Sequence, residues 1–252
     1  MPERKIILIT GAARGIGAVT AENFARLGWA VAIHYHRSAQ SALAVQTELL
    51  LRSGPGAALA VAADVACQEA VQAMFEQVNA GLGPVDALVN NAGANLDGPF
   101  LEMSIEQWRS VLDVILTGTF LCSQEFARRY RGGEGHIVNI GSLSALEGRT
   151  NGANYCSARA GVIALTRCMA LELAPAIRVN CVSPGYIATQ ALVERYHLDD
   201  PQRCAQATAA IPAGSLGKPE DVFQAIRFLV CESRGINGEN LIVDGGKLLR
   251  SE

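Results

Sequence analysis

Residues 6–17 read IILITGAARGIG, an apolar run followed at once by a glycine-rich turn and the start of a helical pattern. Glycines at such a turn let the backbone approach a pyrophosphate, and the helix N-terminus supplies N–H donors and the positive end of the helix dipole. Strand, turn and helix occur in the order that this mechanism needs, so the segment predicts a dinucleotide phosphate site. A tight turn without a ligand is the alternative interpretation.

The rest of the chain repeats this alternation of short apolar strands and longer helices. The expected strands are residues 6–10, 31–35, 58–62, 87–90, 136–140, 178–182 and 241–243. The expected helices lie near 15–28, 38–53, 67–81, 104–131, 155–174 and 219–233. This alternation predicts an α/β fold with a Rossmann-like, doubly wound, mostly parallel seven-stranded sheet and helices on both faces. Because no linker or repeat interrupts the pattern, we expect one dinucleotide-binding domain over residues 1–252.

Residues 186–216 break the rhythm, because their pattern is weakly helical and loop-like and ends in IPAG at 211–214. An insertion of this length in a compact domain favours a substrate loop or lid. A surface excursion without a role is the alternative.

Composition excludes several classes of function. Half of the 252 residues are hydrophobic and 18% are charged, which indicates a large core, and the net charge of −3 offers no attraction to nucleic acid or to an anionic membrane. Seven cysteines without a CxxC pair favour free thiols and a cytoplasmic location. His34 and His36 alternate along one strand and so project to opposite faces, and we expect no metal site.

The glycine spacing after Thr10, G-x3-G-x-G, resembles the phosphate-binding turn of the short-chain dehydrogenase/reductase family. Further segments share the resemblance, namely DV at 64–65, NNAG at 90–93, SPG at 183–185 and VDGG at 243–246. The 3-oxoacyl-carrier-protein reductase branch is the most similar. The resemblance implies hydride transfer between a nicotinamide cofactor and a carbonyl substrate, which is either a small molecule or an acyl thioester. It also implies a homotetramer.

The same resemblance assigns three catalytic residues. Ser142 corresponds to the serine that holds the substrate carbonyl, and Tyr155, 13 positions later (155 − 142), corresponds to the proton donor. A phenol needs a nearby cation to act near neutral pH. The family supplies a lysine four residues after the tyrosine, whereas this chain has Arg159, on the same helix face at i+4. Asn154, next to the tyrosine, is expected to line the substrate entry.

A second departure lies at Ile115, where the family has an asparagine that anchors a water beside the lysine. The two changes have two interpretations. Either the site was retuned and the chain is an active reductase, or the chain is a catalytically impaired pseudoenzyme that binds the cofactor as a sensor or partner subunit.

The end of the second strand reads HYHR at 34–37 and offers no carboxylate to a ribose hydroxyl, while Arg37 and Arg14 suit a 2′-phosphate. We therefore expect NADP(H), with NAD(H) as the less favoured alternative. The expected cofactor contacts are Gly11, Arg14, Gly15, Ile16, Gly17, Tyr35, Arg37, Asp64, Val65, Asn91, Ala92, Gly93, Tyr155, Arg159, Pro184, Gly185, Ile187 and Thr189.

Overall fold

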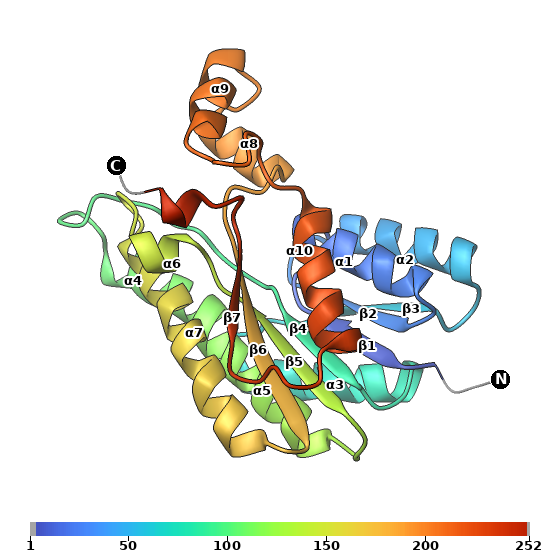
Figure 1. Ribbon diagram of the computed structural model, residues 1–252. Helices are drawn as coiled ribbons and strands as arrows, with labels where there is room; N and C mark the ends of the chain where they lie inside the picture. Colours follow the sequence, from blue (N-terminus) through green and yellow to red (C-terminus); the bar gives the residue numbers. More distant parts are fainter. Residues whose placement is uncertain (1–3, 251–252) are drawn as a thin grey trace.

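Seven parallel strands form one sheet in the order β3-β2-β1-β4-β5-β6-β7 (Figure 1). The structure is a computed structural model that describes residues 4–250. The strands are β1 Ile6–Ile9, β2 Ala30–Tyr35, β3 Ala58–Ala62, β4 Ala87–Asn90, β5 Gly135–Ile140, β6 Ile177–Pro184 and β7 Asn240–Val243. The predicted Rossmann-like fold is confirmed. The strand order reverses between β1 and β4, and such a switch point opens a binding crevice at the carboxyl ends of the strands.

Helices cover both faces of the sheet. They are α1 Gly15–Arg26, α2 Ala39–Ser53, α3 Gln68–Gly81, α4 Ile105–Leu112, α5 Gly118–Arg129, α6 Ser144–Glu147, α7 Ala153–Leu173, α8 Gln190–Tyr196, α9 Pro201–Ala209 and α10 Pro219–Arg227. Ile7 and Ile9 of β1 share a buried cluster with α1, α2 and α10, whereas Ile6 and Leu8 share one with α3, α5 and α7. The period-two alternation of a central strand therefore builds two cores.

Two of the expected helices contain a segment of wider π-helical winding. The helix predicted over 104–131 is divided by Asp113–Thr117, and the one predicted over 219–233 ends in Phe228–Glu232. The first segment lies against α7 at a close approach, because a Cβ atom on Gly161 would come within 2.8 Å of the Leu116 side chain. Such insertions are set by tertiary packing, and the hydrophobic period alone did not indicate them.

Residues 186–216, which the sequence indicates as weakly helical and loop-like, contain two short helices, α8 and α9. Asp200 caps α9 by accepting hydrogen bonds from the amides of Gln202 (2.8 Å) and Arg203 (3.3 Å), and Pro201 occupies the first turn. The two helices project beyond the sheet, above the ends of β6 and β7 (Figure 1). Within residues 4–250, no helix has both the length and the apolar character needed to cross a membrane.

Candidate active site

The turn between β1 and α1 depends on glycine at three positions. Gly11 and Gly15 adopt positive φ angles of 64° and 58°, which other residues rarely tolerate. At Gly17 an added Cβ atom would lie 2.5 Å from the carbonyl oxygen of Gly11. The residues that the sequence assigned to phosphate binding are thus held in a compact cradle at the start of a helix.

A buried histidine supports this turn. The amide of Gly11 donates to Nδ1 of His34 at 3.0 Å, and the amide of Ala12 donates to the His34 carbonyl at 2.9 Å. Because Nδ1 accepts, the ring proton resides on Nε2, which donates to the Ala63 carbonyl at 3.1 Å. Burial lowers the pKa of His34 to about 4, so the ring is neutral. Nothing in the sequence alone indicated that His34 supports this turn, because its partner Gly11 lies 23 positions away.

The segment after β4 is tied to the same turn. The Thr10 hydroxyl accepts from the amides of Asn91 (2.9 Å) and Ala92 (3.0 Å), while the Asn91 side-chain amide donates to the carbonyls of Thr10 and Gly11. Ala92 and Gly93 follow directly. These contacts hold the carboxyl ends of β1 and β4 together beside the phosphate cradle.

The segment after β6 lies opposite the glycine-rich turn. A Cβ atom on Gly15 would lie 3.5 Å from the Thr189 side chain, so the turn and this segment face each other closely. Thr189 caps α8 by accepting from the Leu192 amide, and Ile187 is buried. Pro184 accepts from the Leu143 amide at 2.9 Å, and Gly185 lies against Asp244.

The end of the sheet at β2 and β3 holds the residues expected near the adenosine. Tyr35 ends β2, and Arg14 and Arg37 are exposed, with no ion pair to a carboxylate in the described part of the chain. Asp64 accepts from the Ala66 amide at 3.0 Å. Val65 is buried against Gly118 of α5, so only its backbone can contribute to a binding surface.

The three candidate catalytic residues converge at the start of α7. Ser142 follows β5 and is buried, Tyr155 lies in the first turn of a helix that begins two residues earlier than expected, and Arg159 is 5% exposed. The guanidinium carbon of Arg159 lies 5.4 Å from the centroid of the Tyr155 ring. Spacing along one helix therefore delivers the cation to the phenol, as the i+4 relation predicted.

Opposing influences act on the phenol. Burial raises the pKa of Tyr155, but the charge of Arg159, hydrogen bonding from Ser142 and Arg159, and the charge of Arg149 together lower it below its ordinary value. The site thus makes the phenolate, which is the form that a proton donor leaves behind, easier to form than in an ordinary tyrosine.

The Arg159 guanidinium is held on two sides. Nη1 donates to the Ile140 carbonyl at 2.6 Å, and Nη2 lies where a Cβ atom on Gly93 would come within 2.6 Å. Nε is buried without a partner among residues 4–250. Ile115 is fully buried in an apolar cluster with Val111, Ala158 and Val162 and offers no polar group there.

Arg149 was missed by the sequence analysis, although it lies between Ser142 and Tyr155 in the chain. Its guanidinium carbon is 4.9 Å from the Tyr155 ring centroid, closer than that of Arg159. The only feature of the sequence that could have indicated Arg149 is its long cationic side chain, which lies between two predicted catalytic positions. No periodicity fixes the course of this loop.

Asn154 does not line a substrate entry. Its side chain is fully buried and donates to the carbonyls of Leu96 (2.9 Å) and Gln107 (3.3 Å), while its oxygen accepts from the Tyr155 amide at 2.7 Å. The residue fixes the first turn of α7 to α4 and to the segment before it, which corrects the entry interpretation.

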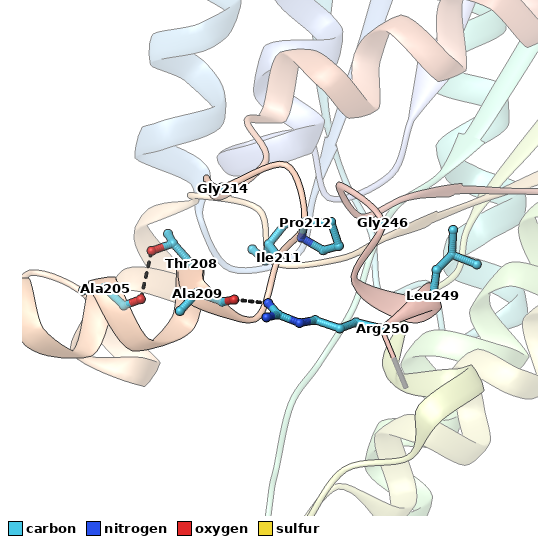
Figure 2. Close-up of a pocket in the computed structure, with 9 residues that line it drawn as sticks. All are labelled: Ala205, Thr208, Ala209, Ile211, Pro212, Gly214, Gly246, Leu249 and Arg250. Carbon is cyan, nitrogen blue, oxygen red and sulfur yellow. Dashed lines mark hydrogen bonds between the residues drawn. The ribbon is translucent and has the colours of Figure 1, made fainter. Parts of the chain in front are cut away.

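A cleft of about 850 Å³ separates α9 from the carboxyl-terminal segment (Figure 2). Its lining residues are Ala205, Thr208, Ala209, Ile211, Pro212, Gly214, Gly246, Leu249 and Arg250. Arg250 donates to the Ala209 carbonyl across the cleft. No predicted catalytic residue lines it, but Lys247, next to Gly246, bonds with Glu147 of α6. Between residues 4 and 250 no cluster of three potential metal-ligating side chains occurs.

Comparison with known proteins decides the family. A family model described as enoyl-(acyl carrier protein) reductase matches residues 11–247. The chain belongs to the short-chain dehydrogenase/reductase family. It is 36% identical to a 3-oxoacyl-[acyl-carrier-protein] reductase from Synechocystis over 97% of each chain. It is also 36% identical to 3beta-hydroxysteroid dehydrogenase 1 from Eggerthella lenta, over 97% of this chain and 94% of that one.

A crystal structure of a provisionally assigned gluconate dehydrogenase from Agrobacterium tumefaciens is similar in fold. It has a TM-score of 0.89 and 33% identity and covers 98% of this chain and 97% of that one. As a short-chain dehydrogenase/reductase, the chain is an oxidoreductase that acts on a carbonyl and alcohol pair with a nicotinamide cofactor.

The residues present fit such a cofactor. Arg14 offers no side-chain hydrogen bond to cap α1, so the first amides of that helix are free of a cap, and the glycine cradle leaves room for a phosphate beside them. The unpartnered Nε of Arg159 is a buried donor beside Tyr155. In this short-chain dehydrogenase/reductase, the turn would hold the phosphates and Arg159 would lie near the nicotinamide end.

Proposed function

We propose that the protein is an NADP(H)-dependent oxidoreductase that interconverts a carbonyl and the corresponding alcohol. The observation that carries the proposal is the surroundings of Tyr155, where the charge of Arg159 and the hydroxyl of Ser142 act on one phenol whose pKa is lowered despite burial. The lowered pKa makes it easier for this phenol to give up its proton.

Each side chain has a separate task in this proposal. When bound, the nicotinamide supplies or accepts a hydride at the substrate carbon. Ser142 donates a hydrogen bond to the carbonyl oxygen, and Tyr155 transfers its phenolic proton to that oxygen as the alcohol forms. Arg159 stabilises the phenolate that remains, and in the oxidative direction this phenolate takes the proton back.

The choice of NADP(H) rests on charge. Arg14 and Arg37 are exposed beside the end of β2 without carboxylate partners in the described residues, and positions 34–37 supply no acid that would repel a phosphate. Arginine recognises phosphate through paired hydrogen bonds.

A 3-oxoacyl thioester is the first substrate to test, because relatives such as the Synechocystis reductase carry that name. The cleft beside α9 is lined mainly by apolar side chains, which suits an acyl chain. Small ketones and a hydroxysteroid, suggested by other relatives, complete the panel. We further propose that residues 186–216 act as the lid over this substrate.

The second candidate function is an impaired NADP-binding protein that acts as a cofactor sensor or partner subunit. One observation favours it: Ile115 is fully buried among apolar side chains, so the position offers no anchor for a water beside Arg159. Nη1 of Arg159 is already bonded to the Ile140 carbonyl. The protein could still bind the cofactor, because binding does not require position 115 or Arg159 to relay protons.

The deciding experiment follows NADPH oxidation with this panel for wild type, Tyr155→Phe and Ile115→Asn/Arg159→Lys. Turnover by wild type that Tyr155→Phe abolishes supports the enzyme. If wild type does not oxidise NADPH and the double variant does, the result supports the impaired NADP-binding protein. NADPH binding, measured by fluorescence, should survive in all three forms, and its absence from wild type would contradict both candidates.

A homotetramer is proposed as the assembly. Phe120 of α5 is 43% exposed and Leu171 of α7 is 83% exposed, and the small residues Ala160 and Ala164 on α7 are also exposed. Small and apolar side chains on long helices permit close helix packing between copies. Light scattering after gel filtration should give four times the chain mass of 26.6 kDa. The seven free cysteines support a reducing compartment such as the cytoplasm.

A further inference from the structure

We propose that Arg149 is a second cation that positions the Tyr155 phenol, and that α8 holds Arg149 in place. The proposal rests on the function proposed above and adds a positioning residue to it. It links the placement of the 186–216 segment to the proton donor.

Two guanidinium groups contact the ring of Tyr155 from different parts of the chain. Arg159 comes from the same helix at 5.4 Å, and Arg149 comes from the loop before that helix at 4.9 Å, both measured from the guanidinium carbon to the ring centroid. A cation this close to an aromatic face is attracted to it, and it also stabilises a negative charge on the phenolic oxygen.

Arg149 is fixed by three partners on two segments. Nη2 donates to Asp97 at 2.7 Å and to Asn95 at 3.0 Å, and Nη1 donates to the hydroxyl of Tyr196 at 3.3 Å. The side chain is only 15% exposed. Because Tyr196 is the last residue of α8, one of these contacts exists only while α8 is docked.

The docking of α8 is part of a closed circuit of contacts that we call the lid clamp, formed by Glu147, Arg149, Tyr186, Tyr196 and Lys247. Tyr196 stacks on Tyr186 with ring centroids 5.7 Å apart, and Nζ of Lys247 lies 5.3 Å from the Tyr186 centroid. Lys247 bonds with both oxygens of Glu147 at 3.0 and 2.9 Å. Glu147 precedes Arg149 by two positions, which closes the circuit.

The charged groups around Arg149 leave its charge available to the phenol. Asp97 is its carboxylate partner within residues 4–250, and that carboxylate is shared with Arg195 at 3.5 Å. The phenol itself is faced by Arg159, Arg149 and the Ser142 hydroxyl. Loss of Arg149 therefore removes one of two cations, and the pKa of Tyr155 should rise.

The test is a tyrosinate absorbance titration, which needs no turnover. The chain has five tyrosines, so each protein is measured with and without Tyr155→Phe, and the difference reports Tyr155 alone. Wild type, Arg149→Gln, Arg149→Lys and Tyr196→Phe are compared. Arg203→Gln, an exposed change of equal charge on α9, is the matched control, and thermal melting checks that each variant folds.

We expect Arg149→Gln to move the midpoint of Tyr155 to higher pH, Arg149→Lys to restore part of the shift, and Arg203→Gln to leave the midpoint in place. Where turnover is present, Arg149→Gln should lower kcat/KM roughly two- to fivefold at neutral pH, the range of one such contact. An unchanged midpoint in Arg149→Gln overturns the second cation, and an unchanged midpoint in Tyr196→Phe overturns the role of α8. Absence of turnover in every form would count against the proposed function, while the titration would still decide this inference.

Discussion

Nδ1 of His34 accepts a hydrogen bond from the amide of Gly11 at 3.0 Å, so a titratable ring holds the phosphate-binding turn. The contact requires the neutral ring, because a protonated imidazole has no acceptor. Protonation of His34 in acid should therefore break this support of the turn.

Stability should fall as the pH drops from about 6.5 to about 4. Burial lowers the pKa of His34 and of His136 to about 4 from an ordinary 6.5, so the unfolded chain takes up protons first over this window. The stabilisation from each neutral ring is complete above pH 6.5 and is lost toward pH 4. It amounts to roughly 3 kcal/mol per histidine.

Urea unfolding at several pH values measures this dependence. His34→Asn keeps an acceptor for the Gly11 amide but does not titrate. The slope of the free energy of unfolding against pH should therefore decrease by an amount that corresponds to the uptake of up to one proton. The exposed His197 is not among the groups that shift the pKa of His34 and provides the matched control, and His197→Asn should leave the contribution of His34 to the slope in place. Equal slopes for wild type and His34→Asn would contradict the assignment of the neutral ring.

Arg37 should distinguish the two nicotinamide cofactors. Loss of one charge-assisted contact to a 2′-phosphate costs about 1.5–3 kcal/mol, so Arg37→Ala should weaken NADPH binding roughly 10- to 100-fold. NADH binding should stay within about twofold. Fluorescence titration with both cofactors measures the ratio, and Arg52→Ala on the exposed part of α2 controls for the change in net charge. Equal weakening of both cofactors would place Arg37 away from the phosphate.

Gly93 and Arg159 should be coupled. A Cβ atom at position 93 would lie 2.6 Å from Nη2, so Gly93→Ala forces the guanidinium to move. We expect kcat/KM to fall roughly 10- to 100-fold, less than the roughly 10²- to 10⁴-fold lost with an acid–base group, because the guanidinium is displaced and not removed. In an Arg159→Lys background the same substitution should reduce kcat/KM much less, because lysine lacks the guanidinium group that approaches position 93. Additive effects in this double-mutant cycle would show that the close approach has no bearing on activity.

Ile115→Asn should be poorly tolerated unless Arg159 changes with it. The position is fully buried among apolar side chains, and an unsatisfied amide there, with the loss of packing, should cost roughly 3 kcal/mol of unfolding free energy. Ile115→Val, which removes one methylene, should cost about 1 kcal/mol. If Ile115→Asn/Arg159→Lys is more stable than Ile115→Asn alone, the two positions changed together. Equal instability of both variants would indicate that they are independent.

Much of the fold was accessible from the sequence because strands buried on both faces are short, apolar and β-branched. The run from Ile6 to Ile9 was found for that reason, and its neighbours followed from the alternation with helices. The convergence of Ser142, Tyr155 and Arg159 followed from two simple constraints: parallel strands end at one edge, and i+4 residues share a helix face.

Other features have no such local signature. Helix α9 buries no residue completely, so it shows no strong apolar stripe, and only the Asp200 and Pro201 pair marks its start. The π-helical segment at Asp113–Thr117 depends on packing against distant partners. The position of Arg149 over Tyr155 depends on how an irregular loop closes, which neither period nor propensity determines.

The lid clamp has a consequence for how the protein is made. Strands β1 to β4, which carry the phosphate cradle, are complete by Asn90, whereas the bond from Lys247 to Glu147 joins residues 100 positions apart and needs the final strand. The amino-terminal half-sheet therefore leaves the ribosome long before the residues that hold α8 in place exist. A chain growing from its amino terminus therefore completes the glycine-rich turn first and the contacts of the lid clamp last.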